Sequence, residues 1–412
     1  MTETTTTWVE GAAGSLFDLD NLPYGVFSLR DQEGGGDDPR VGVRIGDHVL
    51  DLAPVAEIGD PASVLAAAWR TPSLNAFMAM GPEQWAIARE WIVEVLGHDV
   101  HEARTAPHLH PLTAVEMHLP IEVGDYVDFY ASEHHASNVG RIFRPDAEPL
   151  LPNWKHLPVG YHGRSGTVVA SGTDIVRPCG QRKAPADDAP TYGPSRRLDI
   201  EAELGFVVGT PTRLGERVST ADFAAHTFGV VGLNDWSARD VQAWEYVPLG
   251  PFLGKSFATS ISHWVTPLAA LDAAWTDLPG QDPEPLDYLR VDGPAGLDIA
   301  VEVVLDGEVV SRPPYATMYW SPAQMLAHTT VNGASVRTGD LWASGTISGP
   351  DADQRGSLLE LSWGGQEPFT AGGRERTFLE DGDEVTLRYT APGTSGGRIA
   401  LGEVTGRVVP AR

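Results

Sequence analysis

The sequence predicts a mainly β protein of the α+β class. From residue 121 onward, glycine and proline interrupt many short runs of alternating apolar and polar residues, a pattern typical of antiparallel strands. The chain has 412 residues, which exceeds the usual size of one hydrophobic core. A polar, proline-containing segment at about 98–120 is typical of a linker. We therefore expect two domains, 1–118 and 119–412.

The first domain is expected to contain a hairpin and two helices. Residues 41–52 form two alternating runs joined by a Gly-Asp turn, which predicts paired antiparallel strands. One helix is predicted over about 61–70. A second is predicted over 82–97, because Pro82 suits the first helical position and Gly97 suits the end.

The second domain is expected to contain one clear helix among its strands. Ser321 is a favourable N-cap, Pro322 follows it, and the pattern runs to about Val331 before Gly333. The polar, proline-rich segment 184–195 is expected to be a surface loop.

Charge and cysteine content exclude several kinds of protein. The net charge of −27 argues against a nucleic-acid or anionic-membrane partner. Cys179 is the single cysteine, so an internal disulfide and a cysteine-rich zinc site are both impossible. The N-terminal residues lack the pattern of a signal peptide, and no apolar run reaches about 18 residues. We expect a cytoplasmic protein in which Cys179 is structural.

Three acidic residues stand out by their position in predicted strands. Residues 198–206 alternate, so Glu201 and Glu203 point to the same side, roughly 7 Å apart. A solvated polar face is the alternative explanation. Asp235 ends the apolar run 228–235, and a carboxylate at the end of a core strand is often functional. Helix capping is the alternative for Asp235.

A fourth acid, Asp128, precedes a histidine by seven residues. If this stretch is helical, Asp128 and His135 share one face, roughly 10 Å apart. The alternative is an N-cap aspartate beside a surface histidine. Four carboxylates that converge would repel one another, and a divalent cation removes that cost. Ligation by oxygen alone suits Ca²⁺, Mg²⁺ or Mn²⁺ and disfavours zinc. The sequence alone does not show that the four converge.

Other polar residues have both a catalytic and a structural explanation. Glu360 lies among apolar residues in a predicted strand and requires a partner if it is buried; otherwise it faces outward. Arg239 and Gln242 are three residues apart and can share a helical face, as catalytic donors or as surface polarity. Lys255 follows the loop 250–254 and is either a fixed donor or a surface lysine.

Several long strings resemble the fumarylacetoacetase family (the fumarylacetoacetate hydrolases). They run from about residue 15 to the C-terminus. Because the strings are long and specific, the probability of chance similarity is negligible. The strings are Asp125-Tyr126-Val127-Asp128-Phe129-Tyr130, His135-Ala136-Ser137-Asn138-Val139-Gly140, Leu151-Pro152-Asn153-Trp154, and the segments 157–164, 234–240, 244–257, 344–350 and 359–363.

This resemblance implies a fold, a reaction and an assembly. The fold would be a small N-terminal Src-homology-like β-barrel followed by a mixed β-sandwich roll. The reaction would be hydrolysis of the C–C bond of 4-fumarylacetoacetate to fumarate and acetoacetate, the last step of tyrosine breakdown. The enzyme would be a homodimer and would use a divalent cation, Mg²⁺ or Ca²⁺, with Mn²⁺ as a further possibility.

The resemblance also assigns roles to individual residues. The metal ligands would be Asp128, Glu201, Glu203 and Asp235, with a second cation near Asp235, Lys255 and Thr259. The general base would be His135, with Glu360 as its orienting partner. The oxyanion donors would be Arg239, Gln242 and Lys255. The residues that hold the substrate would be Tyr130, Arg144, Tyr161, Gln242, Tyr246 and Thr346. In this hypothesis His135 deprotonates a water that attacks the fumaryl-side carbonyl, and the cation takes up the enolate charge.

One feature departs from the family pattern. Glu133 and His134 precede His135, so two histidines compete for the role of base, and spacing to Ala136 and Asn138 assigns it to His135.

Two other functions are alternatives to this assignment. The broader superfamily includes hydrolases of acylpyruvates and other diketo acids, which are usually shorter and lack the N-terminal barrel. The non-enzymatic alternative is a calcium-stabilised β protein that binds a partner through its acidic face.

Overall fold

The structure, a computed structural model, describes residues 6–30, 38–59 and 64–412. Within them, thirteen strands form one large mixed sheet. Its strands are β1 (Tyr24–Leu29), β2 (Arg40–Ile45), β3 (His48–Asp51), β4 (Leu109–Pro111), β5 (Val115–His118), β6 (Tyr126–Phe129), β7 (Gly160–His162), β8 (Val168–Ala170), β13 (Ala202–Val208), β14 (Thr227–Asp235), β16 (Thr259–Ile261), β17 (Trp264–Pro267) and β22 (Leu341–Ala343). The order is β4-β3-β2-β1-β17-β14-β13-β22-β6-β7, with β5 beside β1 and β16 between β14 and β8.

Smaller sheets surround this one. A five-stranded sheet in the described chain has the order β21-β20-β25-β26-β9. Its strands are β9 (Ile175–Val176), β20 (Ala300–Leu305), β21 (Glu308–Ser311), β25 (Glu384–Pro392) and β26 (Arg398–Val409). The two-stranded pairs are β10 (Cys179–Arg182) with β11 (Thr191–Pro194), β12 (Leu198–Asp199) with β15 (Ser237–Ala238), β18 (Trp275–Thr276) with β19 (Gly296–Leu297), and β23 (Phe369–Ala371) with β24 (Arg374–Arg376). The protein is thus mostly β, as predicted.

The α-helices are short apart from α4. Those in the described residues are α1 (Leu52–Gly59), α2 (Val64–Trp69), α3 (Asn75–Met78), α4 (Pro82–Gly97), α5 (Glu102–Thr105), α6 (Glu133–Phe143), α7 (Phe223–His226), α8 (Arg239–Glu245), α9 (Pro322–Thr330) and α10 (Leu358–Leu361). The predicted helices at 82–97 and after Ser321 are confirmed, and Ser321 and Gln324 form a capping box. Of the predicted helix 61–70, α2 covers 64–69, while 61–63 lie outside the described residues.

The N-terminal strands are continuous with the rest of the large sheet. The predicted hairpin is confirmed, because β2 and β3 pair antiparallel around the Gly46-Asp47 turn. β1 pairs with β17, placing Tyr24 opposite Val265. In the described residues the strands follow an open order, so the small N-terminal barrel is not confirmed. The division into two domains near residue 118 stays a prediction.

Two segments that were predicted to be irregular contain strands. The expected linker at 98–120 holds α5, β4 and β5, and β4 and β5 pair with β3 and β1, so that prediction was wrong. The expected loop at 184–195 ends in β11, which pairs with β10 so that Cys179 lies opposite Pro194. Both segments are polar at the surface, and their strands are too short to give an alternating signal.

The central strands β13 and β14 are buried on both sides. One apolar core contains N-terminal residues such as Val26 and Ile92 together with Val231 and Leu233 of β14. A second core lies on the other side and includes Val230 of the same strand, together with residues of the five-stranded sheet. Every residue of β13 and β14 is therefore buried, including the polar ones. This arrangement withdraws the acidic residues of these strands from water.

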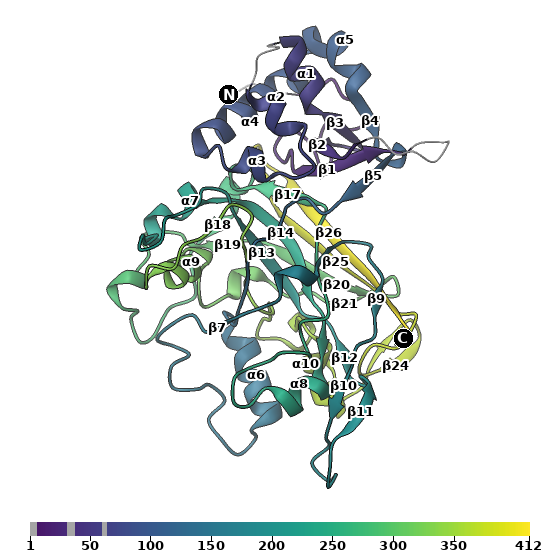
Figure 1. The fold of residues 1–412 in the computed structure, drawn as a ribbon, viewed down its shortest axis with the longest axis vertical. Helices are drawn as coiled ribbons and strands as arrows, with labels where there is room; N and C mark the ends of the chain where they lie inside the picture. Colours follow the sequence, from purple (N-terminus) through teal and green to yellow (C-terminus); the bar gives the residue numbers. More distant parts are fainter. Residues whose placement is uncertain (1–5, 31–37, 60–63) are drawn as a thin grey trace.

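Figure 1 shows the N-terminal strands and helices α1–α5 at one end of the molecule. Helices α6, α8 and α10 lie toward the other end, together with the β10–β11 hairpin. Among the described residues, no helix combines the length and apolar character that crossing a membrane requires.

Candidate active site

Four buried carboxylates from three strands converge in the large sheet. Asp128 lies on β6, Glu201 immediately precedes β13, Glu203 lies on β13, and Asp235 ends β14. Each offers one oxygen, and these oxygens all lie within 4.8 Å of one another. Strand register causes the convergence, because Ala202 pairs with Asn234 of β14. On its other edge β13 pairs with β22, and β22 pairs with β6 beside Asp128.

The structure decides between the alternatives left open for these acids. The alternating run 198–206 is not a solvated face, because Glu203 is 0% exposed and Glu201 is 5% exposed. The run is also not one strand: β12 ends at Asp199 and β13 begins at Ala202. The helix assumed to join Asp128 and His135 is wrong, because Asp128 lies on β6 while His135 lies on α6.

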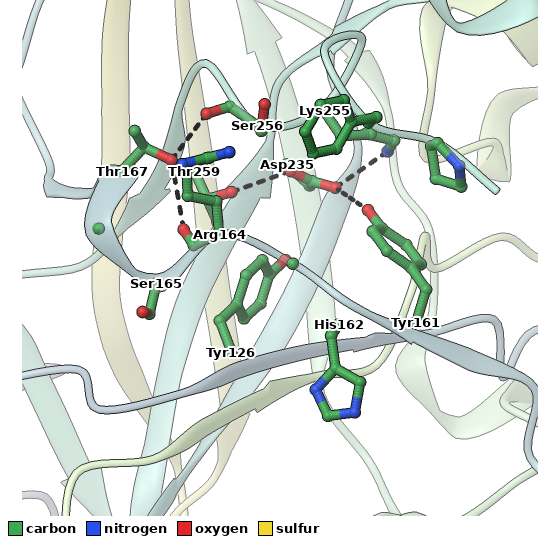
Figure 2. A pocket seen from close by; sticks show the side chains of 14 residues that line it. Tyr126, Tyr161, His162, Arg164, Ser165, Thr167, Asp235, Lys255, Ser256 and Thr259 are labelled. Carbon is green, nitrogen blue, oxygen red and sulfur yellow. Dashed lines mark hydrogen bonds and ion pairs between the residues drawn. The ribbon is translucent and has the colours of Figure 1, made fainter. Parts of the chain in front are cut away.

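Two cationic side chains contact the cluster, both of them at Glu201. The Lys255 ammonium lies between Glu201 and Asp235, with Nζ 3.0 Å from Asp235 Oδ2. The Arg239 guanidinium places Nη2 2.8 Å from Glu201 Oε1. Asp235 also accepts hydrogen bonds from Thr259 Oγ1 at 3.0 Å and from the Tyr161 hydroxyl at 3.3 Å. Figure 2 shows Lys255, Thr259 and Tyr161 directed at the Asp235 carboxylate.

The charges within the cluster are unevenly balanced. Burial raises the pKa of Asp128 and of Glu203 well above the usual value, and neighbouring carboxylates raise both further. Glu201 is the opposite case: burial raises its pKa, but Lys255 and Arg239 outweigh that effect and hold the pKa below the usual value. The cationic side chains thus compensate Glu201, whereas the more distant Lys255 charge does not offset the burial of Asp128 and Glu203.

The side of the cluster with Asp128 and Glu203 has the chemistry of a cation site. Asp128 Oδ1 and Glu203 Oε1 are buried and have no hydrogen-bond partner within the described part of the chain. Buried polar atoms are normally satisfied, so two buried carboxylate oxygens without a hydrogen-bond partner, in a cluster of four acids, indicate a site for a positive charge. Four carboxylate ligands suit a hard divalent cation. The residues present therefore fit the divalent metal that the sequence predicted.

A buried histidine–glutamate pair lies beside this cluster. Nδ1 of His135 lies 2.7 Å from Glu360 Oε2. Ser132 caps α6 by accepting from the backbone N–H of His135, which fixes the histidine in the first turn. Glu360 was expected on a strand; it lies instead on α10, a four-residue helix capped by Ser357. The expectation that Glu360 is buried and requires a partner is confirmed.

Three donors that sequence reasoning missed hold the Glu360 carboxylate. Asn138 Nδ2 donates to Oε1 at 3.0 Å, and the hydroxyls of Ser348 and Ser357 donate to Oε2 at 3.0 and 2.8 Å. Burial raises the pKa of Glu360, but His135 and these donors outweigh it and lower the pKa below its usual value. An ionised carboxylate only accepts, so Nδ1 of His135 carries the proton. The signal available in the sequence was Asn138, three residues after His135.

The free nitrogen of His135 faces the acidic cluster. Nε2 lies 3.9 Å from Glu201 Oε1. Glu133, the unusual acid next to the histidine pair, forms an ion pair of 2.7 Å with Lys155. His135 is therefore the histidine of this pair that contacts Glu360, and Glu133 is occupied elsewhere.

The residues expected to hold a substrate differ in how closely they contact the acidic cluster and His135. The Tyr130 ring meets the His135 ring edge-on, with centroids 5.3 Å apart. Tyr161 contacts Asp235, as described above. Thr346 is buried beside Gly345, whose N–H donates to Glu203, and the Thr346 hydroxyl has no partner among the described residues. Arg144 directly follows α6; its Nη2 donates to Pro149 O, and its buried Nε has no partner in the described chain.

Helix α8 carries Gln242, and Tyr246 directly follows its last residue. Gln242 accepts a hydrogen bond from Arg239 Nη1 at 3.2 Å and so lies beside the cluster. Tyr246, one turn later, is 44% exposed, and within the described residues no hydrogen bond joins its side chain to the site. The predicted helical face shared by Arg239 and Gln242 is confirmed. Within the described residues, no hydrogen bond or ion pair joins the side chain of Tyr246 or that of Arg144 to the acidic cluster or to His135.

A pocket of about 480 Å³ opens beside Asp235 and Lys255 (Figure 2). Its polar end is formed by these two residues with Tyr161, and Phe252 contributes to its apolar wall. Arg164 lies at the same pocket, with its guanidinium 5.8 Å from the centre of the Phe252 ring. The pocket therefore borders the Asp235 end of the acidic cluster.

Two family models match almost the whole chain. The model described as Fumarylacetoacetate (FAA) hydrolase C-terminal matches residues 126–409, and the model described as Fumarylacetoacetase N-terminal matches residues 20–120. The fumarylacetoacetase of Caenorhabditis elegans is 47% identical over 412 residues, covering 96% of this chain and 97% of the relative. The human fumarylacetoacetase is 47% identical over 415 residues, covering 97% and 98%.

Solved structures share the fold at low sequence identity. A fumarylacetoacetate hydrolase from the psychrophilic Exiguobacterium antarcticum is 19% identical, with a TM-score of 0.54 over 94% of this chain and 100% of that chain. A putative HpcE protein from Mycobacterium smegmatis is also 19% identical, with a TM-score of 0.54 over 94% and 99%. At this identity the similarity concerns the fold alone.

Proposed function

This chain belongs to the fumarylacetoacetase family, and we propose from that membership that it hydrolyses 4-fumarylacetoacetate to fumarate and acetoacetate. The observation that carries the proposal is the position of His135. Its Nδ1 is held by Glu360, and its Nε2 faces the four-carboxylate cluster 3.9 Å from Glu201. A base beside a hard-cation site is the arrangement that hydrolysis of a chelating diketone requires.

A divalent cation would be held by Asp128, Glu201, Glu203 and Asp235. When bound, it supplies Lewis acidity that polarises the diketone oxygens and stabilises negative charge on the departing fragment. We propose Mg²⁺ or Ca²⁺, with Mn²⁺ as a further possibility, because all four ligands are carboxylates. Thr259 and Lys255 lie on the Asp235 side, where the family resemblance places a second cation.

His135 acts as the general base. Because Nδ1 carries a proton bound to Glu360, Nε2 is free to take a proton from water. The resulting hydroxide adds to the carbonyl carbon on the fumaryl side. The C–C bond then breaks, its electron pair goes to the acetoacetate fragment as an enolate, and the proton held by His135 returns to the enolate carbon. The new carboxyl group of the fumaryl product releases one proton to solvent, so fumarylacetoacetate and water give fumarate, acetoacetate and one proton, and atoms and charge balance.

The polar residues around the cluster have unused donors for the oxyanion. Lys255 has three N–H groups, and Glu201 and Asp235 occupy two of them. Gln242 accepts from Arg239 through Oε1, which leaves its amide N–H₂ to donate. Removal of one oxyanion donor typically lowers the rate about 100- to 1,000-fold. Tyr130, Arg144, Tyr161, Tyr246 and Thr346 stay proposed substrate contacts, and the homodimer stays a proposal from family membership.

An assay with fumarylacetoacetate tests this function. The purified protein is treated with a chelator, and loss of the diketone absorbance is followed with and without added Mg²⁺, Ca²⁺ or Mn²⁺. We expect cleavage that depends on the metal. Faster cleavage of an acylpyruvate than of fumarylacetoacetate would reassign the substrate. Metal-dependent stabilisation without cleavage of any diketo acid would favour the non-enzymatic binding protein.

A further inference from the structure

Asp199 is a buried acid next to the metal cluster for which the family resemblance assigns no role. It lies on β12, two residues before Glu201, and is 0% exposed. We propose that Asp199 is a positioning residue that holds the Arg239 side and the Glu360–His135 side of the site at one fixed separation. This inference rests on the proposed function and assigns it a further residue.

The Asp199 carboxylate accepts four hydrogen bonds. Oδ1 accepts from the backbone N–H of Leu358 at 2.7 Å and of Ile200 at 2.8 Å. Oδ2 accepts from the backbone N–H of Leu359 at 3.0 Å and from Arg239 Nε at 2.8 Å. Each oxygen thus binds one N–H of α10, and one oxygen also binds the guanidinium.

The first pair of bonds determines where Glu360 lies. Leu358 and Leu359 are the first two residues of α10, and Glu360 is the third. A helix of four residues has little stability of its own, so outside contacts must hold it in place. Asp199 anchors two of its backbone N–H groups. The carboxylate that orients His135 therefore depends on Asp199 for its position.

The bond to Arg239 determines the orientation of the guanidinium. With Nε bound to Asp199, Nη2 reaches Glu201 at 2.8 Å and Nη1 reaches Gln242 at 3.2 Å. The guanidinium is planar and rigid, so fixing one nitrogen fixes the other two. Asp199 consequently controls the side of the site that contains Glu201 and Gln242.

The Asp199 carboxylate therefore binds both the Arg239 side and the Glu360–His135 side of the site. Residues 199, 239 and 358–360 are far apart in sequence, and β12, α8 and α10 meet at this side chain. A displacement of about 1 Å in a catalytic group can cost about 100-fold in rate. Loss of Asp199 moves the base and the oxyanion donors relative to one another, while Asp128, Glu203 and Asp235 stay attached to β6, β13 and β14.

The test compares Asp199→Asn with the wild type on fumarylacetoacetate. Asparagine keeps the size but presents an N–H₂ group to two of the four donors. We expect kcat to fall about 100-fold, while KM and the dissociation constant for the divalent cation change by less than about threefold. If both proteins cleave fumarylacetoacetate with equal kcat, the positioning role of Asp199 is wrong. The proposed function would remain intact in that case, because the wild type cleaves the substrate. No cleavage by the wild type would overturn both.

Asp383→Asn is the matched control for general destabilisation. Asp383 is also buried, accepts from Arg376 Nη1 and Nη2 at 3.0 and 2.9 Å, and accepts from the N–H of Glu380 at 2.7 Å. Its substitution should lower thermal stability to a similar extent and leave kcat unchanged. An equal loss of kcat in this control would assign the effect of Asp199→Asn to stability alone.

A double-mutant cycle with Glu360→Gln distinguishes positioning from an unrelated effect. If Asp199 acts through α10, Asp199→Asn and Glu360→Gln together lose much less activity than the product of their separate losses. Fully multiplicative losses would contradict coupling through α10. If Asp199→Asn does not fold, Leu358→Pro removes one N–H donor at a position where helices accept proline. That variant should show a smaller loss of kcat with metal affinity retained, and unchanged kcat would overturn the proposal.

Discussion

Nδ1 of His135 lies 2.7 Å from Oε2 of Glu360, although 225 residues separate the two in the chain. The pair is buried and three further side chains donate to the carboxylate. The arrangement fixes the tautomer of the imidazole, so that Nδ1 is protonated and Nε2 is basic. The proposed chemistry depends on this single hydrogen bond more than on any other contact outside the acidic cluster.

The first prediction concerns this pair. His135→Ala should abolish turnover, and Glu360→Gln should lower kcat about 100- to 10,000-fold, which is the range of general-base catalysis. The metal content of His135→Ala should stay close to that of the wild type. His134→Ala is the control and should retain activity. Normal turnover by His135→Ala would refute the assignment of the base.

The second prediction concerns the cation. Because no lysine or arginine among the described residues forms an ion pair with Asp128 or Glu203, a bound divalent ion should stabilise the folded protein. A free concentration about 100 times the dissociation constant should raise the free energy of unfolding by about 2.7 kcal/mol. Thermal unfolding after chelation, with and without Ca²⁺, Mg²⁺ or Mn²⁺, measures this increment.

Substitutions at the cluster test where that ion binds. Asp128→Asn combined with Glu203→Gln should remove the metal-dependent increment, because two of the four ligands lose their charge. Asp340→Asn is the control: Asp340 is a buried acid outside the cluster, and burial raises its pKa as well. An increment that survives the double substitution would place the ion elsewhere.

The third prediction separates substrate binding from stability at Thr346. Its buried hydroxyl has no partner within the described residues, so Thr346→Val should leave the free energy of unfolding unchanged within about 0.5 kcal/mol. If the hydroxyl binds substrate, KM should rise about 10-fold, equivalent to about 1.4 kcal/mol. Thr227→Val removes a similarly unpartnered buried hydroxyl at the start of β14 and should leave KM unchanged. Equal KM values in both variants would exclude the contact.

The fourth prediction concerns the dependence of stability on pH. Burial and, to a smaller extent, the nearby His118 together lower the pKa of His263 to about 4. An unfolded histidine has a pKa of about 6.5. As the pH falls below that value, the unfolded chain binds a proton that the folded chain does not, so stability decreases from about pH 6.5 down to about pH 4. Above pH 6.5 this contribution is fully present.

Denaturant unfolding at several pH values measures that contribution. The stability of the wild type relative to His263→Gln should fall between pH 7 and pH 4 by at most about 3 kcal/mol. Comparing the two proteins cancels the titration of the other groups. A difference between them that stays constant over this interval would show that His263 titrates alike in both states.

The sequence by itself determined the features that depend on neighbouring residues. The hairpin at 41–52, the helix that begins at Pro82 and the helix capped by Ser321 follow from local patterns, and all three are present. The long strings around Asp128 and Asp235 also sufficed to place the chain in its family, because a match of residue identities at many positions requires no coordinates.

Only the tertiary structure decided which polar residues meet. Alternation at Glu201 and Glu203 is the same for a solvated strand and for one covered on both sides, and the two cores around β13 decided in favour of burial. Glu360 lies on a helix too short to show a helical period, so its pattern suggested a strand. The role of Asp199 depends on partners 40 and about 160 residues away. Such contacts arise from strand register and packing, which no local pattern records.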